Sequence, residues 1–99
     1  MFESIRDRMR QLVRSLDYVM TIHGEEEMES DGLSILDVEN AILTGEIVER
    51  QREENSKEPK YLVTGRTLDG DEVVVVGKIG LTGILVIITV YREADEYEN

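Results

Sequence analysis

The hydrophobic pattern of the chain changes its period at Gly45. Before this glycine, apolar residues recur every three or four positions, as they do along the buried stripe of an amphipathic helix. After it, they alternate with polar residues or form short continuous runs, which is typical of β-strands. This order predicts an α+β fold in which N-terminal helices pack against an antiparallel sheet of four or five strands.

Three helical segments are expected in the first half of the chain. The first, over roughly residues 2–16, has an apolar stripe formed by Phe2, Ile5, Met9, Leu12, Val13 and Leu16. A short extended segment at 18–22 leads into a brief second helix that begins near His23. The third has the clearest start, because Ser34 fits an N-cap and Asp37 follows three residues later, as in a capping box. Gly45 ends this third helix.

The second half reads as strands and turns. Strands are expected over 46–49 and 60–67, separated by a polar loop, and Asp69-Gly70 marks a hairpin turn because glycine supplies the positive φ angle. The apolar runs 73–76 and 84–90 indicate strands buried on both faces. The face away from the helices then needs cover, either from curvature of the sheet or from a partner chain.

Composition restricts the possible partners. Acidic residues outnumber basic ones by 22 to 11, which gives a formal net charge of −11. A field of that sign repels phosphate backbones and disfavours generic nucleic-acid binding, whereas it attracts basic proteins. Cysteine is absent from the sequence, which excludes thiol nucleophiles and cysteine-ligated zinc.

The length fits one domain over residues 1–92, followed by an acidic tail over 93–99. No apolar stretch is long enough to span a bilayer, and the first residues do not open a signal peptide. We therefore expect a cytoplasmic protein that makes no membrane contact.

His23 is the single histidine, and it lies where an extended segment meets a helix. Histidine is the residue type that titrates nearest neutrality, so His23 is a candidate general acid or base. The alternative is that its ring bonds a neighbouring backbone group and packs beside Tyr18. One histidine followed by Glu26 and Glu27 matches no established metal-site spacing, so neither a metal nor another cofactor is expected.

Arg66, Tyr91 and Arg92 complete the candidate catalytic set, and all three lie at the ends of expected strands. Two arginines can hold a phosphate while a tyrosine or a histidine moves a proton, which is the chemistry of metal-independent RNA cleavage. The alternative is that both arginines are surface cations paired with nearby acids and that Tyr91 is a packing residue.

A dense acidic run extends from residue 25 to residue 31, and its members Glu26, Glu27 and Glu29 are candidate partner-binding residues. They suit a basic protein partner. The first helix carries the opposite charge along one side, from Arg6, Arg10 and Arg14 at intervals of four. These arginines form a solvated face, dock an anionic partner, or meet the acidic run within the fold or across a homodimer.

Several short motifs are shared with a known family. They are Tyr18-x-x-Thr21-x-His23-Gly24, Asp31-Gly32-Leu33-Ser34, Gly45-Glu46-Ile47-Val48-Glu49, Gly65-Arg66-Thr67 and Ile87-Ile88-Thr89-Val90-Tyr91-Arg92. On these residues the chain resembles, over about three quarters of its length, the bacterial and archaeal domain-of-unknown-function family numbered 4258. Its members look like relatives of the RelE and BrnT ribonuclease toxins, which are neutralised by antitoxins.

This resemblance implies an RNA-cleaving toxin whose site includes His23, Arg66, Tyr91 and Arg92. The family helix usually carries two basic residues, and alignment on the histidine places them at Glu27 and Asp31, where the charge is reversed. Two functions therefore stay open. One is a toxin-like ribonuclease paired with an antitoxin, with RNA as its substrate. The other is a non-catalytic interaction module or homodimer whose acidic helix binds a basic partner.

Overall fold

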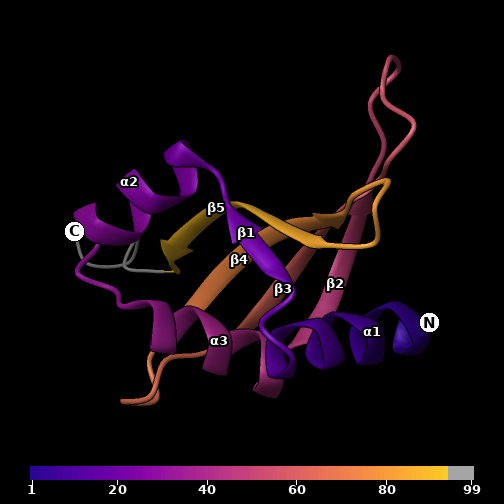
Figure 1. Cartoon of the computed structure of the whole chain (residues 1–99). Helices are drawn as coiled ribbons and strands as arrows, with labels where there is room; N and C mark the ends of the chain where they lie inside the picture. Colours follow the sequence, from indigo (N-terminus) through magenta and orange to yellow (C-terminus); the bar gives the residue numbers. More distant parts are fainter. Residues whose placement is uncertain (94–99) are drawn as a thin grey trace.

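A computed structural model describes residues 1–93 and contains three helices and five strands within them (Figure 1). The elements in chain order are α1 (Glu3–Arg14), β1 (Tyr18–Met20), α2 (Ile22–Ser30), α3 (Ile35–Thr44), β2 (Glu46–Gln51), β3 (Lys60–Arg66), β4 (Glu72–Ile79) and β5 (Leu85–Arg92). The predicted α+β class is confirmed. From residue 94 onward, the expected acidic tail lies outside the described residues.

The sheet is mixed, so the expectation of a purely antiparallel sheet was wrong. Its strand order is β1-β5-β4-β3-β2, and β1 pairs with β5 in parallel while the other three pairings are antiparallel. The short extended segment after the first helix thus joins the sheet at the far edge, beside the last strand. Parallel neighbours require a long connection, and here two helices and three strands separate the pair.

Helices α1 and α3 cover one face of the sheet, and α2 lies apart from them near the end of β5 (Figure 1). The core between these layers is formed by Met9, Leu12 and Val13 of α1, by Val38, Ala41 and Ile42 of α3, and by Val63, Val73, Val75, Leu85, Ile87 and Val90 of the sheet. All of these side chains are at most 8% exposed. The predicted apolar stripe of the first helix is therefore largely the one that packs.

Leu16 departs from this stripe. It follows the end of α1 with a φ angle of 61°, and its side chain is 70% exposed. The helix stops at Arg14 because the chain must reverse direction to enter β1, and the Leu16 amide donates to the Val13 carbonyl in that turn. The predicted extent of 2–16 was therefore too long.

The start of α3 follows the sequence prediction. Ser34 accepts a hydrogen bond from the Asp37 amide, and the Asp37 carboxylate accepts one from the Ser34 amide, which completes a capping box. The other end of α3 packs closely on β3, where Gly65 lies against the backbone of Ala41. These two contacts fix the position of α3 on the sheet.

The second face of the sheet is only partly covered. On β4 the consecutive residues Val73, Val74 and Val75 are all buried, as expected for a strand covered on both faces. On β5, however, burial alternates, and Val86 and Ile88 are half-buried on the side away from the core. The predicted burial therefore holds on β4 for the first three residues of the run 73–76, since Val76 is half-buried, and does not hold for the run on β5.

Candidate functional site

The N-terminus of α2 is attached to the edge of β5 just beyond the end of β1. The Thr21 hydroxyl accepts from the Gly24 amide and donates to the Ile88 carbonyl, while the Thr21 amide donates to the Ile87 carbonyl. A Cβ atom on Gly24 would lie 3.2 Å from the carbonyl oxygens of both Ile87 and Ile88. The glycine thus permits the close contact that places the next turns of α2 against β5.

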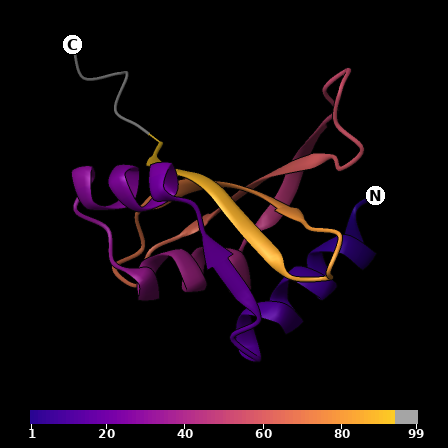
Figure 2. The ribbon, with the colours of Figure 1, turned by 45° about the horizontal axis from the view of Figure 1, so that its top comes forward.

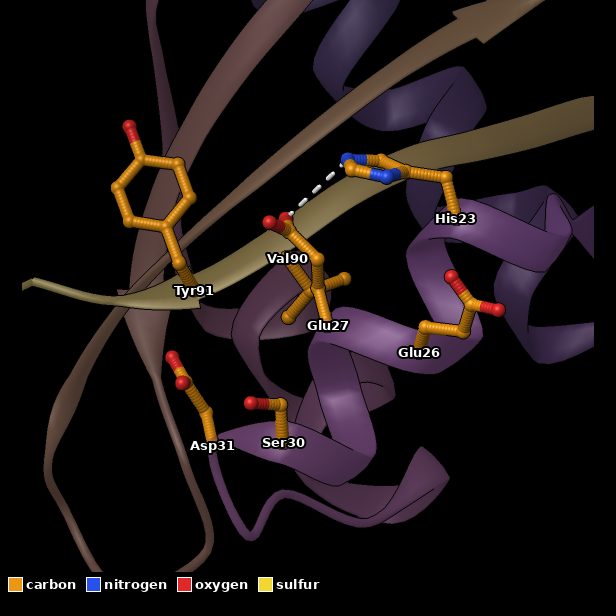
Figure 3. A pocket seen from close by; sticks show the side chains of 7 residues that line it. All are labelled: His23, Glu26, Glu27, Ser30, Asp31, Val90 and Tyr91. Carbon is orange, nitrogen blue, oxygen red and sulfur yellow. Dashed lines mark ion pairs between the residues drawn. The ribbon is translucent and has the colours of Figure 1, made fainter.

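A hollow of about 300 Å³ lies between α2 and the end of β5. Its lining is formed by His23, Glu26, Glu27 and Ser30 of α2, by Asp31 directly after this helix, and by Val90 and Tyr91 of β5 (Figure 3). Several of these positions follow the spacing of one helix face, from His23 to Glu27 to Asp31. That spacing is a signal from which Ser30 and Asp31 could have been added to the predicted site.

The centre of the hollow is a histidine beside a carboxylate. His23 Nε2 lies 3.6 Å from Glu27 Oε1, which is an ion-pair distance but too long for a hydrogen bond. The His23 side chain is 61% exposed, whereas the Glu27 Oε1 atom is buried and makes no hydrogen bond within residues 1–93. Among residues 1–93, the His23 ring is the ionisable neighbour of this buried oxygen.

Tyr91 lies on the same hollow but makes no direct contact with the histidine. In the view of Figure 3 the Glu27 carboxylate stands between the His23 ring and the Tyr91 hydroxyl. Tyr91 is 39% exposed. The structure thus brings two of the four candidate catalytic side chains to one place.

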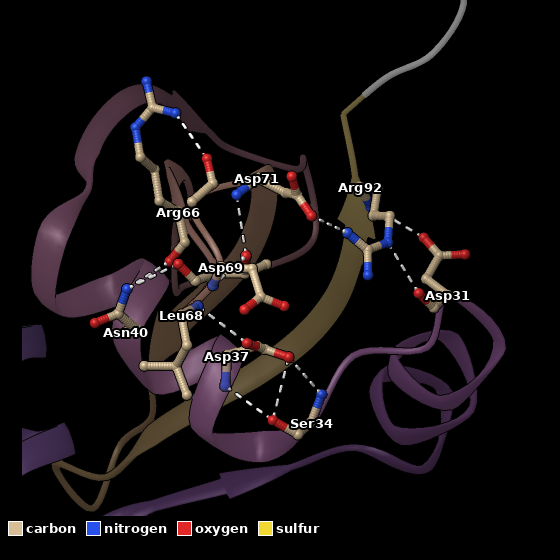
Figure 4. Close-up of polar contacts among 11 residues, drawn as sticks. Asp31, Ser34, Asp37, Asn40, Arg66, Leu68, Asp69, Asp71 and Arg92 are labelled. Atoms are coloured by element: carbon tan, nitrogen blue, oxygen red, sulfur yellow. Dashed lines mark hydrogen bonds and ion pairs between the residues drawn. The ribbon is translucent and has the colours of Figure 1, made fainter.

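Arg92 is held on the other side of this strand end. Its Nε donates to the Asp31 carbonyl oxygen at 3.0 Å, and its Nη1 donates to Asp71 Oδ2 at 3.1 Å (Figure 4). The Arg92 amide also donates to Asp31 Oδ2 at 2.9 Å. This guanidinium therefore connects the end of α2 to the turn between β3 and β4, and it does not line the hollow.

Arg66 lies further away, at the end of β3. Its Nη1 donates to the Gly70 carbonyl at 2.9 Å, and its Nη2 lies 3.6 Å from Glu72 Oε2. The surface around it is lined by Thr44, Glu46, Thr64, Gly65, Glu72 and Glu93 and shares no residue with the hollow. Both candidate arginines thus interact with acidic or carbonyl oxygens.

The candidate partner-binding residues differ in position. Glu26 and Glu27 line the hollow, whereas Glu29 lies outside its lining. Glu26 and Glu29 are exposed, and Glu27 is half-buried. Within the described part of the chain, none of these glutamates forms an ion pair with an arginine or a lysine. Glu27 lies beside the His23 ring.

The arginines of α1 are not the counterpart of these acids within the fold. Arg6 Nη1 contacts Glu46 Oε1 at 3.0 Å, and Arg10 donates to the Gly45 carbonyl at 2.7 Å and lies 3.6 Å from Glu46. Both arginines thus hold the start of β2. Arg14 forms no ion pair with another residue in the range 1–93.

A polar network between α3 and the turn after β3 was not predicted from the sequence. Asp37 Oδ1 accepts from the Leu68 amide at 3.0 Å, and the Asn40 side chain donates to the carbonyls of Arg66 and Thr67 (Figure 4). The amides of Ser34 and Leu68, in that order of importance, hold the pKa of Asp37 below its ordinary value. The network joins α3 to the turn after β3, so its role is structural.

No group of three or more histidine, aspartate or glutamate side chains within residues 1–93 is arranged to hold a metal ion. Among the same residues, no helix combines the length and the apolar character needed to cross a bilayer.

The fold and the hollow define a small α+β domain with a mixed five-stranded sheet and an acidic helix at its edge. The match to a family model covers residues 20–92, and its description is "Domain of unknown function (DUF4258)". The chain belongs to this family, as its motifs predicted. Comparisons with curated proteins and with solved structures gave no match.

Proposed function

We propose that this protein is an interaction domain that binds a basic protein partner through α2 and the hollow beside it. The observation that carries the proposal is the charge of that hollow. Glu26, Glu27 and Asp31 line it, and no arginine or lysine does. Binding of a phosphate requires cationic or amide donors, whereas carboxylates attract lysine and arginine side chains.

The surrounding charge supports the same conclusion. The net charge of −11 raises the encounter rate with basic partners and lowers it with nucleic acids. The Glu27 side chain is 37% exposed and its buried oxygen lacks a hydrogen bond within residues 1–93, so a rotation of the carboxylate would offer this acceptor to an arginine or lysine head group. Arg66 and Arg92 already interact with oxygens of the chain itself. A partner in the cytoplasm, such as a basic antitoxin-like protein, would suit this surface.

The test uses a defined probe, a 12-residue peptide of alternating arginine and serine, titrated into the ¹⁵N-labelled protein at low salt. We expect amide shifts to concentrate on α2 and the end of β5. The triple variant Glu26→Gln/Glu27→Gln/Glu29→Gln should bind about 3- to 140-fold more weakly, since exposed ion pairs contribute about 0.2–1 kcal/mol each.

The matched control removes the same charge elsewhere, in Glu49→Gln/Glu54→Gln/Asp69→Gln. This control should lose only the long-range electrostatic attraction for the peptide. About 0.5 M salt should suppress that attraction in the unmodified protein and in both triple variants. An equal loss of affinity in the two triple variants would show that the peptide senses net charge alone, and the proposal would then be rejected.

A toxin-like ribonuclease of the RelE type is the second candidate, because His23 and Tyr91 line the same hollow. A histidine beside a carboxylate can accept a proton, and a tyrosine hydroxyl can donate one. Inducible expression in a bacterial host, with growth and RNA integrity followed beside a His23→Ala/Arg66→Ala variant, separates the two functions. Arrest with RNA cleavage that the variant abolishes would favour the ribonuclease, whereas normal growth with intact RNA favours the interaction domain.

A further inference from the structure

The strand β1 has a neighbour on one side only, because it lies at the edge of the sheet. The Leu85 amide donates to the Asp17 carbonyl, and the Thr21 amide donates to the Ile87 carbonyl. In such a ladder alternate residues face the same neighbour, so residues 17, 19 and 21 direct their backbone groups toward β5. The amides and carbonyls of Tyr18 and Met20 therefore point away from the sheet.

Three large aliphatic side chains surround this free edge. Leu16 is 70% exposed, Val19 is 52% exposed and Ile22 is 75% exposed. They lie just before, in the middle of and just after the strand, at equal spacing along the chain. Figure 2 shows β1 at the sheet edge, with α1 beyond one end and α2 beyond the other. A free strand edge bordered by exposed apolar side chains is typical of an interaction site.

We propose that a second copy of this chain pairs with β1 in antiparallel orientation, about a two-fold axis at Val19. In this register Tyr18 of one copy lies opposite Met20 of the other, so the free amides and carbonyls of the two strands bond one another. Val19 meets Val19, and Leu16 lies near Ile22 of the other copy. The segment is thus complementary to itself, as an isologous interface must be.

Charge supports this orientation. Arg14 lies before the strand, at the end of α1, and forms no ion pair within residues 1–93, while Glu25 lies after the strand, in the first turn of α2. The antiparallel arrangement places the end of α1 of one copy on the same side as the start of α2 of the other, so these opposite charges face one another across the axis. A parallel arrangement would instead place the two α2 starts on the same side, with their like charges together. The surface differs from the acidic hollow, so the dimer does not depend on the function proposed above.

The test exploits the absence of cysteine from the sequence. The two Val19 residues would form a non-hydrogen-bonded pair, because their backbone groups point toward β5. Directly opposed residues of such a pair have Cα atoms about 4.5 Å apart, which falls within the range that a disulfide spans. We expect Val19→Cys to form a covalent dimer rapidly under mild oxidation. Leu81→Cys is the matched control, because Leu81 is 87% exposed in the turn between β4 and β5. It should cross-link only at the rate of random collision.

Sedimentation equilibrium of the unmodified chain supplies the second measurement. We expect a monomer–dimer equilibrium that Val19→Asp weakens by about tenfold or more, because the substitution places two carboxylates at the axis. Circular dichroism checks that both variants stay folded, as expected for a side chain that is half exposed. A monomeric unmodified chain, cross-linking of Val19→Cys no faster than that of Leu81→Cys, or an unchanged dimer in Val19→Asp would each overturn the proposal.

Discussion

Replacement of Gly65 by alanine should destabilise the fold, because α3 crosses β3 in contact with this residue. A Cβ atom at position 65 would lie 2.0 Å from the Ala41 carbonyl oxygen and 2.7 Å from its carbonyl carbon. These are backbone atoms of a helix, so a rotamer change cannot relieve the clash. The helix must move by about 1 Å, away from a core in which Val38 and Ala41 are fully buried.

Overpacking of this kind costs about 1–3 kcal/mol, and a rigid backbone contact places Gly65→Ala at the upper end. For a domain of this size, about 3 kcal/mol corresponds to a fall in Tm of about 12–24 °C. Urea unfolding followed by circular dichroism measures the change, provided that the m value stays constant. The matched control is Gly80→Ala, where the nearest atoms to the added Cβ are 3.6 Å away.

We expect Gly80→Ala to lie within about 0.5 kcal/mol of the unmodified chain, or to gain slightly through the unfolded state. If Gly65→Ala were as stable as Gly80→Ala, the close packing of α3 on β3 would not limit the fold. The reasoning about the position of α3 would then be wrong.

Three further substitutions test polar contacts. Asp37 has a lowered pKa, so its contribution to folding stability is present above the ordinary value of 3.8 and is lost as the pH falls. Asp37→Asn should therefore show a smaller loss of stability toward acid pH, as measured by urea unfolding from pH 7 to pH 3. Burial, followed by the hydrogen bond to Glu39, raises the pKa of Tyr18 from 10.0 to about 12, so stability should fall as the pH rises through this window. Tyr18→Phe should remove most of that alkaline loss, and an unchanged pH profile would contradict the assignment. Arg92→Met should cost about 1 kcal/mol and increase amide exchange at the end of α2, whereas unchanged exchange there would show that the contact with Asp31 is not needed.

The sequence was most informative where a few neighbouring residues determine the structure. Ser34 and Asp37 predicted the start of α3, because both partners of a capping box lie within four residues. The same holds for the hairpin at Asp69-Gly70, where Gly70 has a φ angle of 91°. It was least informative for β1, whose partner lies more than sixty residues further along the chain and leaves no local signal.

In the candidate site, too, contacts between residues near in sequence were easier to predict than contacts between distant ones. His23 and Glu27 were named from the sequence for separate roles, although their helical spacing of four residues places them on one face, where they lie 3.6 Å apart. Arg66 and Arg92 could not be placed from their positions at strand ends, since oxygens of distant segments compete for a guanidinium group. For Arg92 these oxygens belong to Asp31 and Asp71, which only the tertiary structure brings near.

The parallel pairing of β1 with β5 determines when the site can form during synthesis. Tyr18 pairs with Leu85, so the first strand must wait until residues 85–87 have been translated before it finds its neighbour. The helix that carries His23 rests on the same late strand through Thr21. Until β5 is made, the acidic helix has no surface on which to fold, and a nascent chain cannot engage a partner through the completed hollow. Binding at this place would therefore report that the domain has finished folding.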